Sequence, residues 1–147
     1  MHLTLRFLGE VDEAVLPTLQ AALDREAPPV DADLTLARGG TFGGAARTRV
    51  AWLGVEGDLD ALRALAARVE RAVGAAGLPE EDRPLRVHLT LARVRQDASP
   101  GARRAVADAV SALPAPPPEP FRARELLLVR SHLGGRGPRY EVLSRHG

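Results

Sequence analysis

The tetrapeptide His-Leu-Thr-Leu occurs twice in this chain of 147 residues, at positions 2–5 and again at positions 88–91. In both copies polar and apolar residues alternate, and this alternation predicts a β-strand at each place. Because residues two apart on a strand share a face, each strand would turn its leucines to one side and its histidine and threonine to the other. If the leucines face a core, two imidazoles and two hydroxyls face a cleft.

These four polar side chains are the candidate site residues His2, Thr4, His88 and Thr90. Two groups that titrate near neutral pH and two small hydrogen-bond donors suit a phosphate that undergoes proton-assisted attack. The alternative interpretation is two unrelated strands, because Leu-Thr-Leu also occurs at 34–36 without a histidine. We favour a site, since the histidine precedes the threonine by two places in both copies, and site residues tend to come as geometric sets.

The composition is that of one domain, long enough to bury a core. Its net charge of +1 excludes a broad basic surface for duplex nucleic acid, so an acidic substrate would have to be held locally. The absence of cysteine excludes disulfides, thiolate nucleophiles and cysteine-bound zinc. No apolar run reaches membrane-spanning length and no signal peptide is visible, so the expected location is the cytoplasm.

All 20 lysine-or-arginine positions are arginine, and lysine is absent. Without lysine the chain cannot form a lysyl-adenylate intermediate, a Schiff base or the usual P-loop. An ATP-driven ligase of the lysyl-adenylate kind is therefore excluded. His132 and His146 complete no recognisable metal-ligand spacing with each other or with the motif histidines, so neither a metal nor another cofactor is expected.

Apolar residues spaced three and four positions apart predict three helices. The first runs from Asp12 or Glu13 to Pro28, and the second and third begin after the N-cap residues Asp58 and Ser99. The expected buried positions are Leu16, Leu19 and Leu23 in the first, Leu59, Leu62, Ala66, Val69 and Val73 in the second, and Val106, Val110 and Leu113 in the third.

Alternation predicts further strands at 33–38, 49–55, 121–130 and 139–143. The glycine-rich run 39–44 is expected to be a loop, and it lacks the spacing of a phosphate-binding fingerprint. It is either a simple hairpin connection or a mobile cleft rim where Phe42 meets a base. Strands and helices that interleave in this way predict an α+β fold with internal pseudo-symmetry.

The pattern His-x-Thr-x, present twice and roughly a lobe apart, resembles the signature of the two-histidine (2H) phosphoesterases. The contexts HLTLRFLG at 2–9 and VHLTLAR at 87–93 are similar to the bacterial and archaeal branch of that superfamily. Its members are the RNA 2′,3′-cyclic phosphodiesterases, historically called 2′-5′ RNA ligases. The resemblance continues through RVAWLG at 49–54, the stretch 126–133 and Tyr140, so it covers essentially the whole chain.

This resemblance implies a bilobal fold, in which two antiparallel sheets face each other across a central groove with helices outside. Each lobe would contribute one His-x-Thr strand, and residues 1–147 would form a single phosphoesterase domain. The family normally has a strand and a helix before its first motif, whereas His2 here directly follows Met1. We therefore expect this chain to lack that strand and helix, and the native protein to begin upstream of Met1.

The activity implied by the resemblance is hydrolysis of an RNA or nucleotide 2′,3′-cyclic phosphate to a 2′-phosphate, without a cofactor. His2 would act as general acid and His88 as general base, because the positive charges of Arg86 and Arg93 disfavour protonation of His88. The expected partners are RNA ends or nucleotides with this cyclic phosphate, bound by a monomer that is not attached to a membrane. The alternatives are 2′-5′ RNA ligation, or a non-catalytic nucleotide- or RNA-binding module.

The motif threonines would donate hydrogen bonds to non-bridging phosphate oxygens. Arg93 matches the arginine that follows the second motif in this family and contacts phosphate. Strict alternation places it on the face opposite to the motif histidine, so it needs a bend in the strand. Arg6 and Arg86 lie on the expected faces and are alternative phosphate ligands. Phe42 and Tyr140 are candidates for stacking on a base, with ordinary packing as the alternative for each.

Overall fold

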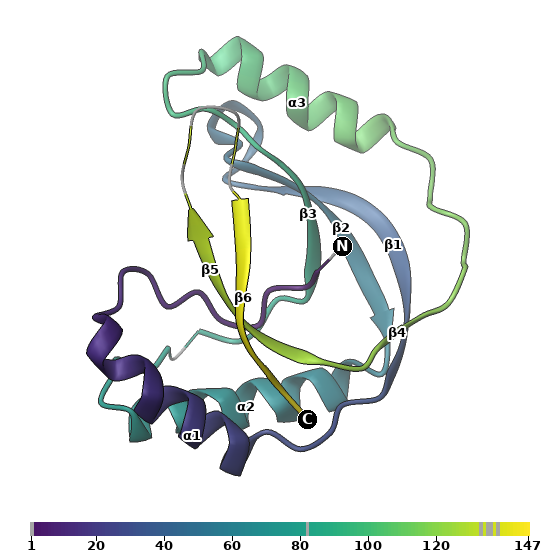
Figure 1. Ribbon diagram of the computed structural model, residues 1–147. Helices are drawn as coiled ribbons and strands as arrows, with labels where there is room; N and C mark the ends of the chain where they lie inside the picture. The colour runs from purple at the N-terminus through teal and green to yellow at the C-terminus, as the bar shows by residue number, and fades with distance from the viewer. Residues whose placement is uncertain (1, 82, 133, 135–136, 138) are drawn as a thin grey trace. The chain divides into compact units, whose positions relative to one another are not determined.

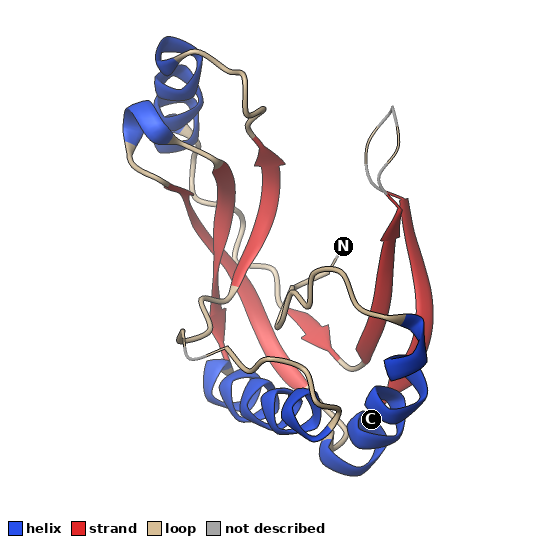
Figure 2. Cartoon of the chain, turned by 90° about the vertical axis from the view of Figure 1, so that its left-hand side faces the viewer, coloured by secondary structure: helices blue, strands red, loops and turns tan. Residues whose placement is uncertain are grey.

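The computed structural model describes residues 2–81, 83–132, 134, 137 and 139–147. The α-helices are α1 (Leu16–Glu26), α2 (Leu59–Ala75) and α3 (Pro100–Ala112), and the short 3-10 helices are η1 (Glu13–Val15) and η2 (Ala45–Arg47). The strands are β1 (Ala32–Phe42), β2 (Val50–Gly57), β3 (His88–Arg93), β4 (Phe121–Ala123), β5 (Leu126–His132) and β6 (Arg139–His146). Figure 1 and Figure 2 show these elements, and the predicted α+β fold class is confirmed.

The described residues form two compact units. The first contains the described residues of 1–5, 33–59 and 86–121, and the second contains those of 6–32, 60–85 and 122–147. Both copies of the repeated motif belong to the first unit, which therefore carries both motif histidines and both motif threonines.

The first unit is built on a sheet whose strands pair in the order β3-β2-β1-β4, with β2 antiparallel to both β1 and β3. Helix α3 packs on β2, and its buried residue is Val110. The Val110 side chain lies against Gly39 of β1, which pairs with Leu53 of β2. The helix therefore covers the sheet face that carries Gly39 and Leu53. Ser99 caps α3 as predicted, because its Oγ accepts a hydrogen bond from the Ala102 N–H at 3.2 Å. One face of this sheet is thus covered by a helix.

The glycine-rich run is mostly strand, so the predicted loop at 39–44 is wrong at its first four positions. Gly40 pairs with Trp52, and a Cβ at Gly40 would collide with the Trp52 ring. Glycine is present there because a large neighbour needs the space. The connection to β2 begins at Gly43 and Gly44, whose φ angles of 112° and 70° favour glycine, and it continues through η2.

The second unit has a core of apolar residues from α1, α2 and β5. Its buried members are Leu19, Ala22, Leu23, Val69, Ala72, Val73 and Leu128. The helical spacing therefore predicted most of the buried faces of α1 and α2 correctly, although Leu16, Leu59 and Ala66 are only half-buried. None of the helices that the structure describes is both long and apolar enough to cross a lipid bilayer.

Three further predictions about local structure are wrong. The segment 2–5 is not a strand, although exposure still alternates along it, because a strand needs a paired neighbour and the motif encodes only the alternation. The predicted strand 121–130 is divided into β4 and β5. Leu113 is 43% exposed, because it follows the last residue of α3 as its C-cap and no longer lies on the buried helix face.

Strand β6 is joined to α1 by a buried histidine. The side chain of His146 is 1% exposed, and its Nδ1 lies 2.6 Å from Oδ1 of Asp24. Its other ring nitrogen, Nε2, lies 2.7 Å from the Ser144 hydroxyl. Both ring nitrogens therefore have polar partners, as a buried imidazole requires.

We predict that His146→Ala lowers the free energy of unfolding by about 1–3 kcal/mol, because it removes a buried ring together with its hydrogen bonds to Asp24 and Ser144 and leaves a cavity. His132→Ala is the matched control, because His132 also pairs with a carboxylate, Glu141, at 2.7 Å but its side chain is 41% exposed. The control should cost less than about 1 kcal/mol. Chemical denaturation measures both, and equal losses would contradict the assignment of His146 as an anchor.

Candidate active site

His88 is the first residue of β3 and is half-buried. Its Nδ1 lies 2.6 Å from the carbonyl oxygen of Arg86, two residues earlier. A carbonyl oxygen only accepts hydrogen bonds, so Nδ1 must carry the proton and donate it. The neutral ring therefore has its lone pair on Nε2, where it can take a proton from another group, and the protonated ring can return that proton from the same atom.

The imidazole of His88 makes edge-to-face contacts with two aromatic rings. The Phe42 ring lies 4.9 Å from it, edge-on at 87°, and the Trp52 ring lies 6.4 Å away at 63°. Phe42 and Trp52 also contact each other, with ring centres 5.4 Å apart. Such edge-to-face contacts restrict the orientation of a ring as well as burying it. Phe42 was predicted from the sequence as a base-stacking residue, and its contact here is with the histidine.

Cross-strand pairing places the second motif on one face of the sheet. His88 pairs with Gly54, and Thr90 pairs with Trp52. Paired residues of antiparallel strands point to the same side, so His88, Thr90 and Trp52 share a face. Because Thr90 is exposed, its hydroxyl is accessible beside the imidazole. This face is opposite to the one that carries Leu53, near α3.

A β-bulge brings Arg93 to the same face as His88. Ala92 pairs with Ala51 while Thr90 pairs with Trp52, so Leu91 is an extra residue in β3. Beyond the bulge Arg93 pairs with Val50, which lies two residues from Trp52 and hence on its face of β2. Strict alternation would have placed Arg93 on the other face. The bend that the sequence argument required is therefore present in the strand.

The first motif lies in the same unit as the second. His2 and Thr4 are exposed, whereas Leu3 and Leu5 are half-buried. The alternation expected for a strand is therefore kept in an irregular segment. Its histidine and threonine are exposed and belong to the unit that also carries His88 and Thr90.

Arg6 is held by ion pairs in the second unit. Its Nε lies 2.9 Å from Oε1 of Glu70, as an ion pair without the alignment of a hydrogen bond, and its NH2 donates to the Pro79 carbonyl at 2.6 Å. Glu81 lies 3.6 Å away. A hydrogen bond from Arg83, with added charge from Arg83 and Arg6, lowers the pKa of Glu81 to about 2. With its guanidinium so engaged, Arg6 is a structural residue here, and we do not retain it as a phosphate ligand.

The remaining candidates differ in their positions. Arg86 is exposed in the first unit and contributes its carbonyl to His88. Tyr140 lies on β6 in the second unit, 54% exposed and paired with Ser131, so stacking by Tyr140 stays a prediction. Within the described part of the chain, no three histidine, aspartate or glutamate side chains gather closely enough to hold a metal ion.

Residues 1–135 match the 2′-5′ RNA ligase superfamily. The chain belongs to that superfamily. It is 32% identical over 144 residues to an RNA 2′,3′-cyclic phosphodiesterase of Geobacillus stearothermophilus, a match that covers 97% of this chain and 44% of the relative. It is 36% identical over 98 residues to another from Aeropyrum pernix, covering 64% of this chain and 53% of the relative. The chain thus spans about half the length of these curated relatives.

Several solved structures have a similar fold. E. coli LigT in its apo form matches with a TM-score of 0.73 at 28% identity, over 98% of this chain and 73% of LigT. LigT complexed with 3′-AMP matches with a TM-score of 0.71 at 31% identity, over 98% and 74%. The protein TT0787 of Thermus thermophilus matches with a TM-score of 0.62 at 31% identity, over 99% and 76%.

Trp52 is a site residue that the sequence argument did not include. Its position on β2 was predicted, but its partners Gly40 and Thr90 come from strands that are distant in sequence. The one available signal was the pair Trp52 and Gly54. These residues are two apart and so lie on the same strand face, where one has a large side chain and the other has none. Such a pair indicates that the large ring lies across the space that a glycine leaves.

We predict that Gly40→Ala displaces the Trp52 ring and lowers the free energy of unfolding by about 1–3 kcal/mol through overpacking. The chain has one tryptophan, so its fluorescence emission reports this displacement directly. Gly101→Ala is the control, since the nearest atom to a Cβ there is the Ser99 Oγ at 3.8 Å. An unchanged emission spectrum in Gly40→Ala would contradict the packing of Trp52 on β1.

Proposed function

We propose that this protein hydrolyses 2′,3′-cyclic phosphates at RNA ends or on nucleotides, with a 2′-phosphate as the product. The observation that carries the proposal is the arrangement on β3: His88 has its Nδ1 bonded to the Arg86 carbonyl, and Thr90 and Arg93 share its face. A proton-transfer group, a hydroxyl donor and a guanidinium can thus all contact one bound phosphate. The second histidine and threonine come from His2 and Thr4 of the same unit.

The chemistry needs one base and one acid. Nε2 of His88 takes a proton from water as the water oxygen attacks phosphorus. The bond from phosphorus to the ribose 3′ oxygen breaks, and His2 gives its proton to that oxygen. The product keeps its phosphate on the 2′ oxygen, and proton exchange with water restores both histidines.

The other groups stabilise charge that develops on the non-bridging oxygens. Thr90 and Thr4 donate hydrogen bonds through their hydroxyls, and Arg93 supplies a guanidinium whose fork fits phosphate oxygens. Arg86 is a second guanidinium next to the site. The Phe42 and Trp52 rings keep the imidazole of His88 oriented before substrate arrives.

The comparisons support this proposal in two ways. The two curated relatives are both named RNA 2′,3′-cyclic phosphodiesterases, and the reaction proposed here is the one in that name. LigT, which has a similar fold, was solved with 3′-AMP, a nucleotide that carries a ribose phosphate. The site proposed here is suited to a ligand of that class.

A second candidate activity is 2′-5′ ligation, which the description of the superfamily favours. The 5′-hydroxyl of a second RNA replaces water in the same phosphorus chemistry: its oxygen bonds to phosphorus as the bond from phosphorus to the ribose 3′ oxygen breaks, and no nucleoside triphosphate is consumed. The absence of lysine excludes the lysyl-adenylate route. Incubation of cyclic phosphate RNA with a second RNA that has a free 5′-hydroxyl separates the two activities by product length.

We further infer that the protein acts in the cytoplasm, where RNA ends of this kind arise by cleavage. We infer that it acts as a monomer, because His2, Thr4, His88 and Thr90 all come from one unit of one chain. Both units belong to one phosphoesterase domain on this proposal, since the family match over residues 1–135 includes parts of each.

We predict that His2→Ala and His88→Ala each reduce turnover of cyclic phosphate RNA by about 10²–10⁴-fold, the usual contribution of a general acid or base. Thr4→Ala and Thr90→Ala should each lose about 2–4 kcal/mol of transition-state stabilisation, by analogy with oxyanion donors. Steady-state kinetics on a short RNA measures all four. Turnover near that of the wild type in either histidine variant would refute the assignment, and full binding without turnover in the wild type would favour a binding module.

The acid and base roles can be separated with a good leaving group. A nitrophenyl phosphodiester needs no proton on its leaving oxygen, so it should restore turnover to His2→Ala but not to His88→Ala. The reverse pattern would exchange the two roles. A 3′-phosphate product from the natural substrate would instead refute the proposed orientation of the cyclic phosphate.

We predict that a chelator leaves the activity unchanged, since the mechanism uses only side chains of this chain. Turnover of cyclic phosphate RNA is measured after incubation with EDTA and gel filtration. Complete loss that is restored by one divalent ion would overturn the paired-histidine mechanism in favour of a metallohydrolase.

A further inference from the structure

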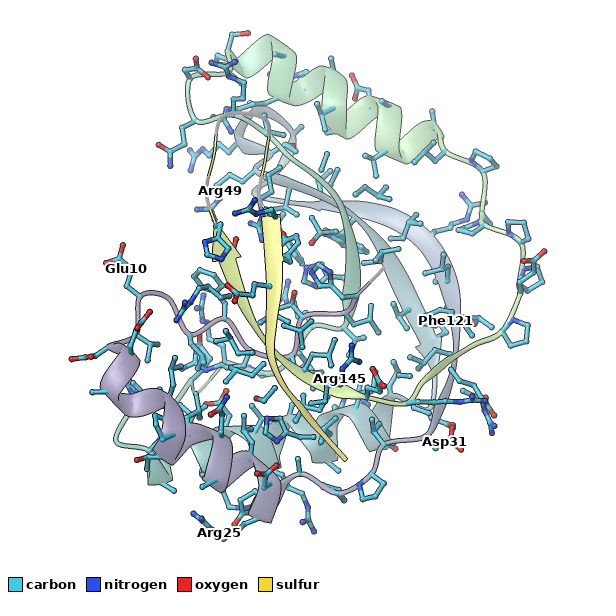
Figure 3. The ribbon with its side chains drawn as sticks, in the orientation of Figure 1. Glu10, Arg25, Asp31, Arg49, Phe121 and Arg145 are labelled. Atoms are coloured by element: carbon cyan, nitrogen blue, oxygen red, sulfur yellow. The ribbon has the colours of Figure 1, made fainter. Side chains whose placement is uncertain are left out.

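Exposed arginines gather at the end of the first unit to which β3 points. We define the arginine cluster as Arg47, Arg49, Arg93 and Arg104, which come from η2, the position just before β2, the end of β3 and α3. All four are exposed, and Arg49 is labelled in Figure 3. The cluster adjoins the candidate active site, because Arg93 lies on the strand that carries His88 and Thr90.

Backbone contacts bring these segments together. The carbonyl of Arg49 accepts a hydrogen bond from the Val94 N–H at 2.9 Å, and the Arg49 N–H donates to the Phe42 carbonyl at 2.9 Å. Val50 pairs with Arg93 in the ladder between β2 and β3. The arginine-bearing segments 47–49 and 93–95 are therefore neighbours through main-chain bonds.

A further arginine, Arg103, locks this end of the unit. Its guanidinium donates to the Thr48 carbonyl at 2.7 Å, and to the carbonyls of Arg95 at 2.9 Å and Gln96 at 2.8 Å. Its Nε donates to the Ala98 carbonyl at 3.1 Å. One side chain of α3 thus joins the segment after β1 to the segment after β3. The arginine cluster is built on a rigid frame.

The positive charge of the cluster is not neutralised within the described residues. None of its four guanidiniums forms a hydrogen bond or ion pair with another residue that the structure describes. The one carboxylate in segments 45–49 and 93–104, Asp97, is bonded to Arg95 at 3.0 and 2.9 Å. Because the whole chain has a net charge of only +1, this concentration is local. Positive charges held close together repel one another and lower the stability of the fold, and a bound anion would remove that repulsion. The cluster therefore indicates an anionic ligand.

We propose that Arg47, Arg49 and Arg104 of the arginine cluster bind backbone phosphates of a single-stranded RNA whose cyclic phosphate end lies at His88, Thr90 and Arg93. This inference rests on the proposed function and extends it from the reacting phosphate to the rest of the substrate. Guanidinium forks match phosphate oxygens, and the cluster continues the line of β3 beyond the site. The preferred substrate is then an oligonucleotide, and a mononucleotide cyclic phosphate reaches only the site itself.

The wild-type enzyme provides the first test. The logarithm of kcat/KM is measured against the logarithm of salt concentration for a ten-nucleotide RNA with a cyclic phosphate end and for 2′,3′-cyclic AMP. The RNA should give the steeper fall, by about 0.7 for each additional phosphate contacted. Equal slopes for the two substrates would overturn the proposal.

The second test removes the arginines that lie outside the proposed reaction site. Arg47→Ala, Arg49→Ala and Arg104→Ala should each weaken kcat/KM for the RNA by roughly two- to fivefold, the size of an exposed charge pair, and reduce its salt slope. Turnover of 2′,3′-cyclic AMP should stay unchanged. Arg25→Ala, an exposed arginine of α1 in the second unit, is the matched control and should affect neither substrate.

A binding measurement keeps this test independent of the reaction. Fluorescence anisotropy with the same RNA ending in a 3′-hydroxyl should show the same losses in the three variants and none in the control. If no cyclic phosphate is hydrolysed, the proposed function fails, and the anisotropy result still decides the RNA surface. If the three variants bind this RNA with the same affinity as the wild type, the proposed RNA surface is wrong. Stronger binding of poly-glutamate than of RNA, lost in the same variants, would overturn it in favour of an acidic protein partner.

Discussion

The pairing of β3 with β2 is the constraint on which the candidate site depends. It places His88 opposite Gly54 and Thr90 opposite Trp52, so the imidazole and the hydroxyl share one face. The extra residue Leu91 then returns Arg93 to that same face. A regular ladder without the bulge would still have placed His88 and Thr90 on one face, but it would have placed the Arg93 guanidinium on the opposite face. The irregularity in the strand therefore adds a charged ligand to a site that regular pairing only partly assembles.

The packing beneath the site depends on absent side chains. Gly40 leaves space for the Trp52 ring, and a Cβ at Gly54, the partner of His88, would lie 3.8 Å from that same ring. A Cβ at Gly54 would lie 3.2 Å from that of Ala37, so the bulge in β1 also requires a small residue here. The aromatic ring can then lie flat enough to contact both Phe42 and the imidazole. Orientation of the histidine is thus a result of strand packing, and it exists before any substrate binds.

Arginine has three different roles in this chain, and the surroundings decide among them. Arg6 is neutralised by Glu70, and its two terminal nitrogens donate to the backbone carbonyls of Phe7 and Pro79. Arg103 uses its donors entirely on carbonyls and ties two segments together. Arg93 and its neighbours in the arginine cluster have no such partners among the described residues. In a chain without lysine, the location of carboxylates and carbonyls therefore distinguishes a structural arginine from one available to phosphate.

The sequence by itself determined what depends on neighbours along the chain. Spacing of apolar residues located α1 and α2 and most of their buried faces, the cap at Ser99 located the start of α3, and the repeated tetrapeptide identified both histidines and threonines. These signals are local, because helical periodicity and capping act within a few residues. Only the tertiary structure decided that 2–5 forms no strand, that Gly40 belongs to one, and that Arg6 is engaged while Arg93 is available. Each of these outcomes depends on residues distant in sequence: strand pairing, the space around a ring, and the position of a carboxylate.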